Sequence, residues 1–291
     1  MATGGNSTRI LITVFAHNEE RRIAACLDSL PLNDSSVEVV VVVNGSTDET
    51  AAIVREFSDR AVRLVEYAQG GKSRSWNRFM LDEAPRADAY VFVDGDAQVL
   101  PGSVDALAEC LQANPGANAA AGMPRNGRQA AAYRRLLVNE GGLFGDLYAL
   151  SGSFVERMRA SDLRLPEDLV GDDSLLGALA HTDLGGDADW DDKRVVACEE
   201  AGFLCEPNTL APASLRLQSQ RMVNYAVRHF QNRMVSAIMR DTGPRGLPGQ
   251  MADLYGAWLP RLRPRLHPLW FWFDRRALAR MRARAPAETA A

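Results

Sequence analysis

A run of valine constrains the fold of this 291-residue chain more than any other feature, because positions 37 to 43 are all valine except Glu38. Short β-branched runs without polar alternation are typical of strands buried on both faces of a parallel sheet. Similar apolar runs at 9–15, 61–66 and 89–93 are separated by segments in which apolar residues recur at helical spacing. This alternation predicts an α/β fold with one mostly parallel sheet flanked by helices.

The apolar spacing also predicts where the helices lie. We expect helices over 19–30, 46–57, 73–84, 101–111, 174–180 and 216–240. A Ser46-x-x-Glu49 capping box opens the second, and Pro101 lies in the first turn of the fourth. Between residues 115 and 152 the periodicity weakens, and repeated glycines predict loops and close backbone approaches. An acidic loop over 183–192 and one or two strands over 195–206 follow.

The composition has the balance of a globular protein, with 46% hydrophobic and 24% charged residues. No apolar run approaches the roughly 20 residues of a membrane-spanning helix, and the first residues lack the pattern of a signal peptide. The four cysteines form no Cys-x-x-Cys pair. We therefore expect a cytoplasmic protein without a zinc site or a disulfide framework.

The charge is unevenly distributed along the chain. Residues 261–291 hold eight arginines and two acidic residues, so a net charge of −4 for the whole chain leaves −10 on residues 1–260. Such an acidic body argues against a nucleic-acid partner. The basic tail also carries Trp270, Phe271, Trp272 and Phe273. These aromatics either bind an anionic membrane surface together with the arginines, as a peripheral contact, or pack on the rest of the protein.

Two carboxylates directly follow the strand expected at 89–93. In sheets of this kind ligands bind beyond the carboxyl ends of the strands, and Asp94-Gly95-Asp96 lies at such an end. Burial of both acids without a counter-charge is costly, and their oxygens suit Mg²⁺ or Mn²⁺. The sequence therefore offers a site for a metal that clamps a diphosphate, with a solvated Asp-Gly turn as the alternative.

Other strand ends and one later helix carry further candidates. Gly70-Gly71-Lys72-Ser73 resembles half of a P-loop, but Glu66 stands where the first glycine is needed, so a Walker-type NTPase is disfavoured. Asp172 and Asp173 precede an apolar helix. They either favour its dipole or place a general base over a substrate held at Asp94 and Asp96.

The ordered series of motifs resembles inverting nucleotide-sugar glycosyltransferases of family two, which have the GT-A fold. The resemblance covers residues 9–225, about three quarters of the chain. The matching segments are Phe15-Ala-His-Asn-Glu-Glu20, Val43-Asn-Gly-Ser-Thr-Asp-Glu-Thr50, Gly71-Lys72 followed by Asn77, Asp94-Gly-Asp96, Ser151-Gly-Ser153, Asp172-Asp173-x-Leu-Leu and Gln218-Ser-Gln-Arg221-Met222.

The resemblance implies a role for each matched residue. The loop with Phe15, Ala16, Asn18 and Glu19 would line the nucleoside, together with Asn44. Lys72 would lie near the diphosphate, Asp94 would touch the nucleotide, and Asp96 would hold Mg²⁺ or Mn²⁺ with help from Asp94. Asp173 would be the catalytic base, with Asp172 as second candidate. Arg221 would lie near the diphosphate or the acceptor.

Some positions depart from the pattern of the family. Val43-Asn44 stands where an Asp-Asp pair is frequent, and the first of those acids commonly reads the base, usually uracil. Met222 replaces the tryptophan of processive members, so we expect transfer of one sugar to an acceptor hydroxyl that the sequence does not identify. Metal and Lys72 would stabilise the leaving diphosphate, and one displacement would invert the anomeric carbon.

Two alternatives differ in function. A nucleotidyltransferase would normally carry a Gly-rich basic loop after the first strand, but the loop here is acidic and lacks glycine. A non-catalytic binding protein with the GT-A fold would have no need for Asp94, Asp96 and Asp173. The expected organisation is a GT-A-like domain over 1–225 and a helical, Arg- and aromatic-rich extension over 226–291. A membrane contact of that extension would place the protein at the inner face of the membrane.

Overall fold

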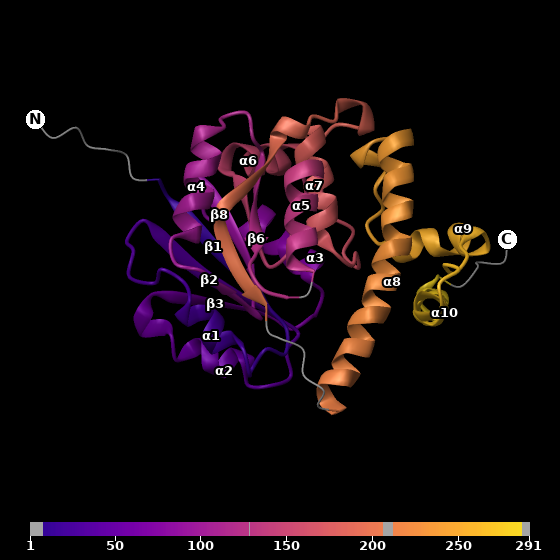
Figure 1. Ribbon diagram of the computed structural model, residues 1–291, viewed down its shortest axis with the longest axis horizontal. Coiled ribbons are helices and arrows are strands. Elements are labelled where there is room, and N and C mark those ends of the chain that lie inside the picture. The colour runs from indigo at the N-terminus through magenta and orange to yellow at the C-terminus, as the bar shows by residue number, and fades with distance from the viewer. Residues whose placement is uncertain (1–7, 128, 206–211, 287–291) are drawn as a thin grey trace, which may run out of the picture.

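The computed structural model describes residues 8–127, 129–205 and 212–286. Its centre is one eight-stranded sheet in the order β3-β2-β1-β4-β7-β6-β8-β5 (Figure 1). The strands are β1 Ile10–Ala16, β2 Val37–Asn44, β3 Val62–Tyr67, β4 Ala89–Asp94, β5 Ala97–Val99, β6 Ala119–Pro124, β7 Leu147–Ser151 and β8 Val195–Cys205. The first four strands in this order are parallel, and β7 runs antiparallel to both β4 and β6. The α/β prediction with a mostly parallel sheet is confirmed.

Helices cover both faces of the sheet. They are α1 Ile23–Asp28, α2 Thr50–Arg55, α3 Lys72–Trp76, α4 Ser103–Ala113, α5 Ala130–Glu140, α6 Gly152–Ser161, α7 Asp172–Thr182, α8 Pro212–Asp241, α9 Tyr255–Trp258 and α10 Pro268–Arg284. A π-helical segment, Asn77–Glu83, continues α3. No helix in the described part of the chain is both long and apolar enough to cross a membrane.

The valine run accounts for the two cores of the molecule. Val40 and Val42 point into the core shared with α6, α7 and α8, whereas Val39, Val41 and Val43 point into the core shared with α1, α2 and α4. All five side chains are at most 3% exposed. A strand with both faces buried needs apolar residues at successive positions, which is the pattern that predicted it.

Three local predictions were wrong. Pro101 precedes the fourth helix and does not lie in its first turn, because α4 begins at Ser103 after Gly102. The segment after β2 does not use a capping box: Ser46 Oγ accepts a hydrogen bond from Asn18 N at 3.0 Å, and the helix begins at Thr50. Residues 115–152 are also more regular than expected, with α5 between β6 and β7. Their glycines mark close packing within this regular structure, because a Cβ on Gly152 would lie 2.2 Å from Ala87 O and one on Gly122 would lie 2.8 Å from the Leu147 side chain.

The C-terminal segment packs along the outer side of α8 (Figure 1). Phe273, Leu278 and Met281 of α10 are buried in the same core as Phe230 of α8. The expectation that the tail aromatics pack on the protein thus holds for Phe273. Other apolar side chains of this segment stay exposed, namely Leu266, Leu269, Phe271 and Trp272. Because α8 passes through residue 225, a domain boundary there remains a prediction.

A buried acid fixes the path of the chain into α10. Asp274 is 0% exposed and accepts three hydrogen bonds from Arg265: from the backbone N at 2.8 Å, Nε at 3.0 Å and Nη2 at 2.6 Å. Burial opposes the charge of Asp274, yet the bonds from Arg265 hold the pKa of Asp274 below its usual value. The pair therefore stabilises the fold when Asp274 is ionised.

We expect Asp274→Ala to lower the free energy of unfolding by about 2 kcal/mol, since it removes charge-assisted bonds around a buried acid. Because the folded-state pKa is lowered, this difference is present above about pH 4 and is lost as the pH falls through that pKa. Urea unfolding at several pH values measures it. Glu66→Ala, which breaks the exposed Arg55–Glu66 pair, is the control and should cost less than about 0.5 kcal/mol. Equal losses in both variants would contradict the role of Asp274.

Candidate active site

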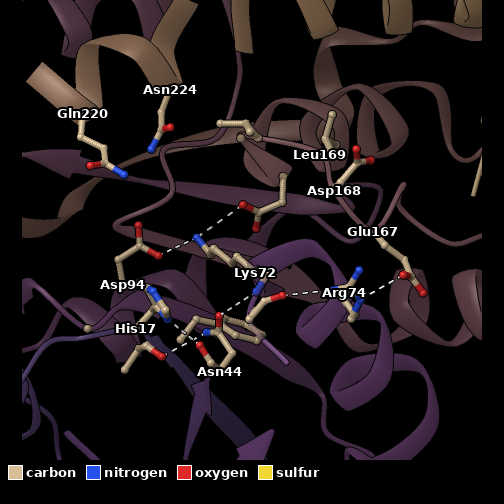
Figure 2. Close-up of a pocket in the computed structure, with 18 of the residues that line it drawn as sticks. His17, Asn44, Lys72, Arg74, Asp94, Glu167, Asp168, Leu169, Gln220 and Asn224 are labelled. Atoms are coloured by element: carbon tan, nitrogen blue, oxygen red, sulfur yellow. Dashed lines mark hydrogen bonds and ion pairs between the residues drawn. The ribbon is translucent and has the colours of Figure 1, made fainter. Parts of the chain in front are cut away.

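The carboxyl ends of β1, β2 and β4 border a cavity of about 870 Å³ (Figure 2). Its other walls come from the loop 166–171, α8 and α10. Most of the site residues expected from the sequence line it: Phe15, Ala16, Glu19, Asn44, Lys72, Asp94, Asp96 and Asp172. Of the other three, Asn18 contacts His17 of the cavity wall, Arg221 contacts Asp96, and Asp173 follows Asp172 in α7. The fold therefore brings the predicted residues together.

A cluster of carboxylates occupies one end of the cavity. Oxygens of Asp94, Asp96 and Asp146 all lie within 4.8 Å of one another. Burial, with the Asp96 charge adding to it, raises the pKa of Asp94 to about 6. Burial and the charges of Asp94 and Asp96 raise the pKa of Asp146 well above its usual value. An all-oxygen set with surplus negative charge fits a hard divalent cation such as Mg²⁺ or Mn²⁺.

Asp146 was missed in the sequence because sheet pairing alone brings it to the site. Strand β7 is antiparallel to β4, and Val93 pairs with Leu147. The residue after Val93 and the residue before Leu147 are therefore neighbours across the two strands, and these are Asp94 and Asp146. No spacing in the sequence connects residues so far apart, and the glycines at 141, 142 and 145 are the sole local signal.

Three basic side chains surround the cluster. Lys72 Nζ lies 2.5 Å from Asp94 Oδ1 and 3.5 Å from Asp172 Oδ1. Burial opposes the charge of Lys72, but Asp172 and Asp94 hold the pKa of Lys72 well above its usual value. Arg221 Nη2 lies 2.7 Å from Asp96 Oδ2, and Arg22 bridges Asp96 and Glu19. Positively charged side chains from three segments of the chain therefore lie beside the cluster.

Asn44 connects the loops that form the floor of the cavity. Its Nδ2 donates to Ala16 O at 3.1 Å, and its Oδ1 accepts from Gly71 N at 3.2 Å. The ring of His17 is 2.6 Å from the backbone oxygen of Asn44 through Nδ1 (Figure 2). Asn44 thus fixes the loops after β1 and β3 relative to the end of β2, and this places Lys72 in the first turn of α3.

Asn18 and Glu19 differ in their surroundings. Asn18 has a positive φ of 57° and its Oδ1 accepts from Thr47 N at 2.8 Å, so it holds the loop after β1 against the loop after β2. Glu19 lines the cavity. Burial, and to a lesser degree the charge of Asp96, raises the pKa of Glu19 to about 7.

The paired acids lie in the first turn of α7, where the helix dipole favours negative charge. Asp173 is 6% exposed and accepts a bond from Arg228 Nη2, with the nearer oxygen at 3.0 Å. Asp172 is 3% exposed, and its Oδ2 has no hydrogen-bond partner in the described part of the chain. Arg228 was missed in the sequence, although it follows Arg221 by seven residues, which is two turns of one helix face.

Gly145 lies between the carboxylate cluster and these acids. A Cβ on Gly145 would lie 3.3 Å from Asp94 Oδ2, 3.5 Å from Lys72 Nζ and 3.7 Å from Asp173 Oδ2. The proposed metal ligand, the lysine and the second acid of α7 therefore all lie beside the same backbone position. A side chain at position 145 would contact all three.

Comparison with known sequences assigns the N-terminal half of the chain to a protein family. Residues 11–163 match the family model described as glycosyl transferase family 2. A 4,4'-diaponeurosporenoate glycosyltransferase from Staphylococcus aureus (strain MRSA252) is 35% identical over 98 residues, which is 33% of this chain and 26% of that protein. The chain thus aligns with about a quarter of the length of this curated relative.

Comparison with solved structures extends the similarity to the whole fold. A mannosyltransferase from Pyrobaculum calidifontis, solved with GDP-Man and Mn²⁺, superposes with a TM-score of 0.59 at 21% identity over 96% of this chain and 86% of that one. Glucosyl-3-phosphoglycerate synthase from Mycobacterium tuberculosis, solved with Mn²⁺, UDP and glucosyl-3-phosphoglycerate, has a TM-score of 0.52 at 22% identity over 75% and 78%. The chain belongs to glycosyl transferase family 2 and has the GT-A fold.

Proposed function

We propose that the protein is a metal-dependent inverting glycosyltransferase that moves one sugar from a nucleoside-diphosphate sugar to an acceptor hydroxyl. The observation that carries this proposal is that Asp94 of the carboxylate cluster, Lys72 and Asp173 all lie beside Gly145. A displacement at an anomeric carbon needs a stabilised leaving group on one side and a base on the other. Both kinds of group are present at this place.

The carboxylate cluster and Lys72 would hold the donor diphosphate. Asp96 and Asp94, with Asp146 beside them, fit a Mn²⁺ or Mg²⁺ ion, which when bound would neutralise the diphosphate as it leaves. Lys72 lies against Asp94 and would add a second positive charge to the same diphosphate. Arg221 pairs with Asp96 and would keep that carboxylate oriented toward the cavity.

Asp173 would act as the general base. The acceptor oxygen forms its bond to the anomeric carbon while the bond from that carbon to the diphosphate oxygen breaks, and the acceptor proton passes to Asp173. Because the attack comes from the face opposite the diphosphate, the configuration at that carbon inverts. Arg228 fixes the orientation of Asp173 through its 3.0 Å contact. Asp172 is the second candidate, supported by its position in the cavity wall.

The nucleoside would lie between the loop 15–19 and Asn44, both of which line the cavity. We propose uracil as its base, as the resemblance to the family implies. The solved relatives include a complex with UDP and one with GDP-Man. Titration with UDP and GDP in the presence of Mn²⁺ separates the two. Release of pyrophosphate from a nucleoside triphosphate and a sugar 1-phosphate would favour a nucleotidyltransferase instead.

We also propose that the enzyme works in the cytoplasm at the inner face of an anionic membrane. The support is the apolar tip formed by Leu266, Leu269, Phe271 and Trp272, whose side chains are between 42% and 100% exposed. Arginines of the same helix complement an anionic lipid surface, and apolar side chains beside basic ones are typical of peripheral helices.

The first prediction of the proposed function concerns the metal site. Asp96→Ala should lower the Mn²⁺-dependent affinity for UDP at least about tenfold, because it removes a metal ligand and the partner of Arg221. Calorimetry of the folded variant measures this. Asp162→Ala removes an acid whose side chain is 91% exposed, and it should leave the affinity unchanged. Undiminished Mn²⁺-dependent binding in Asp96→Ala would refute the assignment.

The second prediction concerns the base. Asp173→Asn should keep UDP binding and slow sugar transfer by at least about 100-fold, since an amide cannot take the acceptor proton. Single-turnover release of UDP from the donor identified in a nucleotide-sugar panel provides the rate. Asp172→Asn is the matched comparison, with the same change one residue earlier. A rate for Asp173→Asn within a few-fold of wild type would transfer the role to Asp172.

The third prediction concerns the apolar tip. Leu269→Ser should weaken sedimentation with anionic vesicles by about tenfold, because a leucine that enters lipid contributes on the order of 2 kcal/mol. Leu136→Ser changes a similarly exposed leucine on α5 and serves as the control. Binding of the wild type should also fall with added salt. Full-length protein that ignores anionic vesicles would rule out the membrane contact.

A further inference from the structure

Two arginines of α10 line the active-site cavity without a carboxylate partner among the described residues. Arg280 and Arg284 border the same space as Lys72 and Asp172. Other cations at the cavity each have an acid: Lys72 has Asp94, Arg74 has Glu167, and Arg221 has Asp96. None of the ion pairs between described residues includes Arg280 or Arg284. Positive charge at this end of the cavity is therefore left for a ligand.

The two arginines belong to a stripe along one helix face. Arg276, Arg280 and Arg284 are four residues apart, so they lie on the same side of α10. Arg280 also borders a second hollow of about 510 Å³, lined by Arg216, Ser219, Gln220, Val223, Arg276 and Arg280. This lining contains three arginines and no acid. The stripe thus joins a basic hollow to the active-site cavity.

Neutral oxygens accept hydrogen bonds from two of these arginines. Arg280 Nη1 donates to Asn224 Oδ1 at 2.7 Å, and Arg276 Nη1 donates to Ser219 Oγ at 3.3 Å. Burial, and then the charge of Arg284, lowers the pKa of Arg280. Two neighbouring like charges with no acid paired to them among the described residues gain most from an anion with several oxygens, and guanidinium groups bind phosphate through paired hydrogen bonds.

The stripe and the proposed base are held by neighbouring turns of α8. Asn224, which binds Arg280, and Arg228, which binds Asp173, are one turn apart on α8, a rise of about 6 Å. Figure 2 shows Gln220 and Asn224 projecting from α8 on the side of the cavity that holds Asp94. The same helix therefore positions both Arg280 and Asp173.

We infer that Arg280 and Arg284 form the acceptor subsite and bind a phosphate group carried by the acceptor. The donor diphosphate belongs at Lys72 and the carboxylate cluster, so this second basic end serves the other substrate. The inference rests on the proposed function for the identity of the donor end. A soluble phosphate ester and the phosphate of a lipid offer the same chemistry to the arginines, and the stripe begins next to the apolar tip.

Calorimetry with sn-glycerol 3-phosphate, with glycerol as its uncharged match, tests the subsite. The full-length Asp96→Ala protein is the background, so that the phosphate cannot be held through a metal at the donor end. In this background Arg280→Gln with Arg284→Gln should weaken binding at least about tenfold. Arg275→Gln with Arg282→Gln removes the same charge from positions of α10 that are not among the residues lining the cavity, and binding should stay within twofold. Circular dichroism establishes that each variant is folded.

The outcomes separate the subsite from the proposed function. UDP binding with Mn²⁺, measured with Asp96 intact, should be equal in both double variants and wild type. If the wild type does not bind UDP, the proposed donor site is refuted, but the phosphate subsite is not. Equal weakening of glycerol 3-phosphate binding in both double variants, or no binding at all, would overturn the subsite. Binding to vesicles with and without phosphatidic acid distinguishes the source of the phosphate. A larger loss of binding to phosphatidic acid in the Arg280 and Arg284 double variant than in the Arg275 and Arg282 double variant indicates a lipid phosphate. Equal losses in the two double variants indicate a soluble ester.

Discussion

The crowding of carboxylates at one sheet edge is the interaction on which the rest of the structure depends. Carboxylate oxygens of Asp94, Asp96 and Asp146 lie within 4.8 Å of one another, and Asp172 Oδ1 is 3.5 Å from Nζ of Lys72, which contacts Asp94. Burial of so much negative charge is unfavourable unless positive charge accompanies it. Lys72, Arg221 and Arg22 provide part of it, and each comes from a different segment of the chain. The need for counter-charge thus ties α3, α8 and the loop after β1 to one point.

The sheet topology creates this crowding. Parallel strands β1, β2 and β4 end at the same edge, and antiparallel β7 begins there. The last residue of β4 and the residue before β7 are therefore neighbours, although more than fifty positions separate them. The helix α8 then crosses the open side of the cavity with Arg221, Asn224 and Arg228 on one face. Each of these side chains contacts a different part of the site: Asp96, Arg280 and Asp173.

The parts of this arrangement that depend on local patterns were predictable from the sequence. The valine run marked a doubly buried strand, and Asp94-Gly-Asp96 marked the end of another. Features that depend on pairing over long distances were not predictable: Asp146 reaches the site through the β4–β7 register, and Arg280 through the packing of α10 on α8. The capping box failed for a related reason, because Asn18 from a distant loop binds the Ser46 hydroxyl that the local pattern assigned to the helix.

The tail illustrates how one segment serves two purposes. Phe273, Leu278 and Met281 secure α10 to the core, while Arg280 and Arg284 line the cavity and its first turn stays exposed. A helix divided in this way can join an active site to an external surface.

The most direct test of the central claim is the position of the metal. Crystals grown with Mn²⁺ and UDP should give an anomalous peak between Asp94, Asp96 and Asp146, with at least one carboxylate oxygen about 2.2 Å from the ion. The diphosphate should lie on the Lys72 side of that peak. A manganese ion bound elsewhere, or UDP bound with no ion at the three carboxylates, would contradict the claim that the cluster exists to hold a metal.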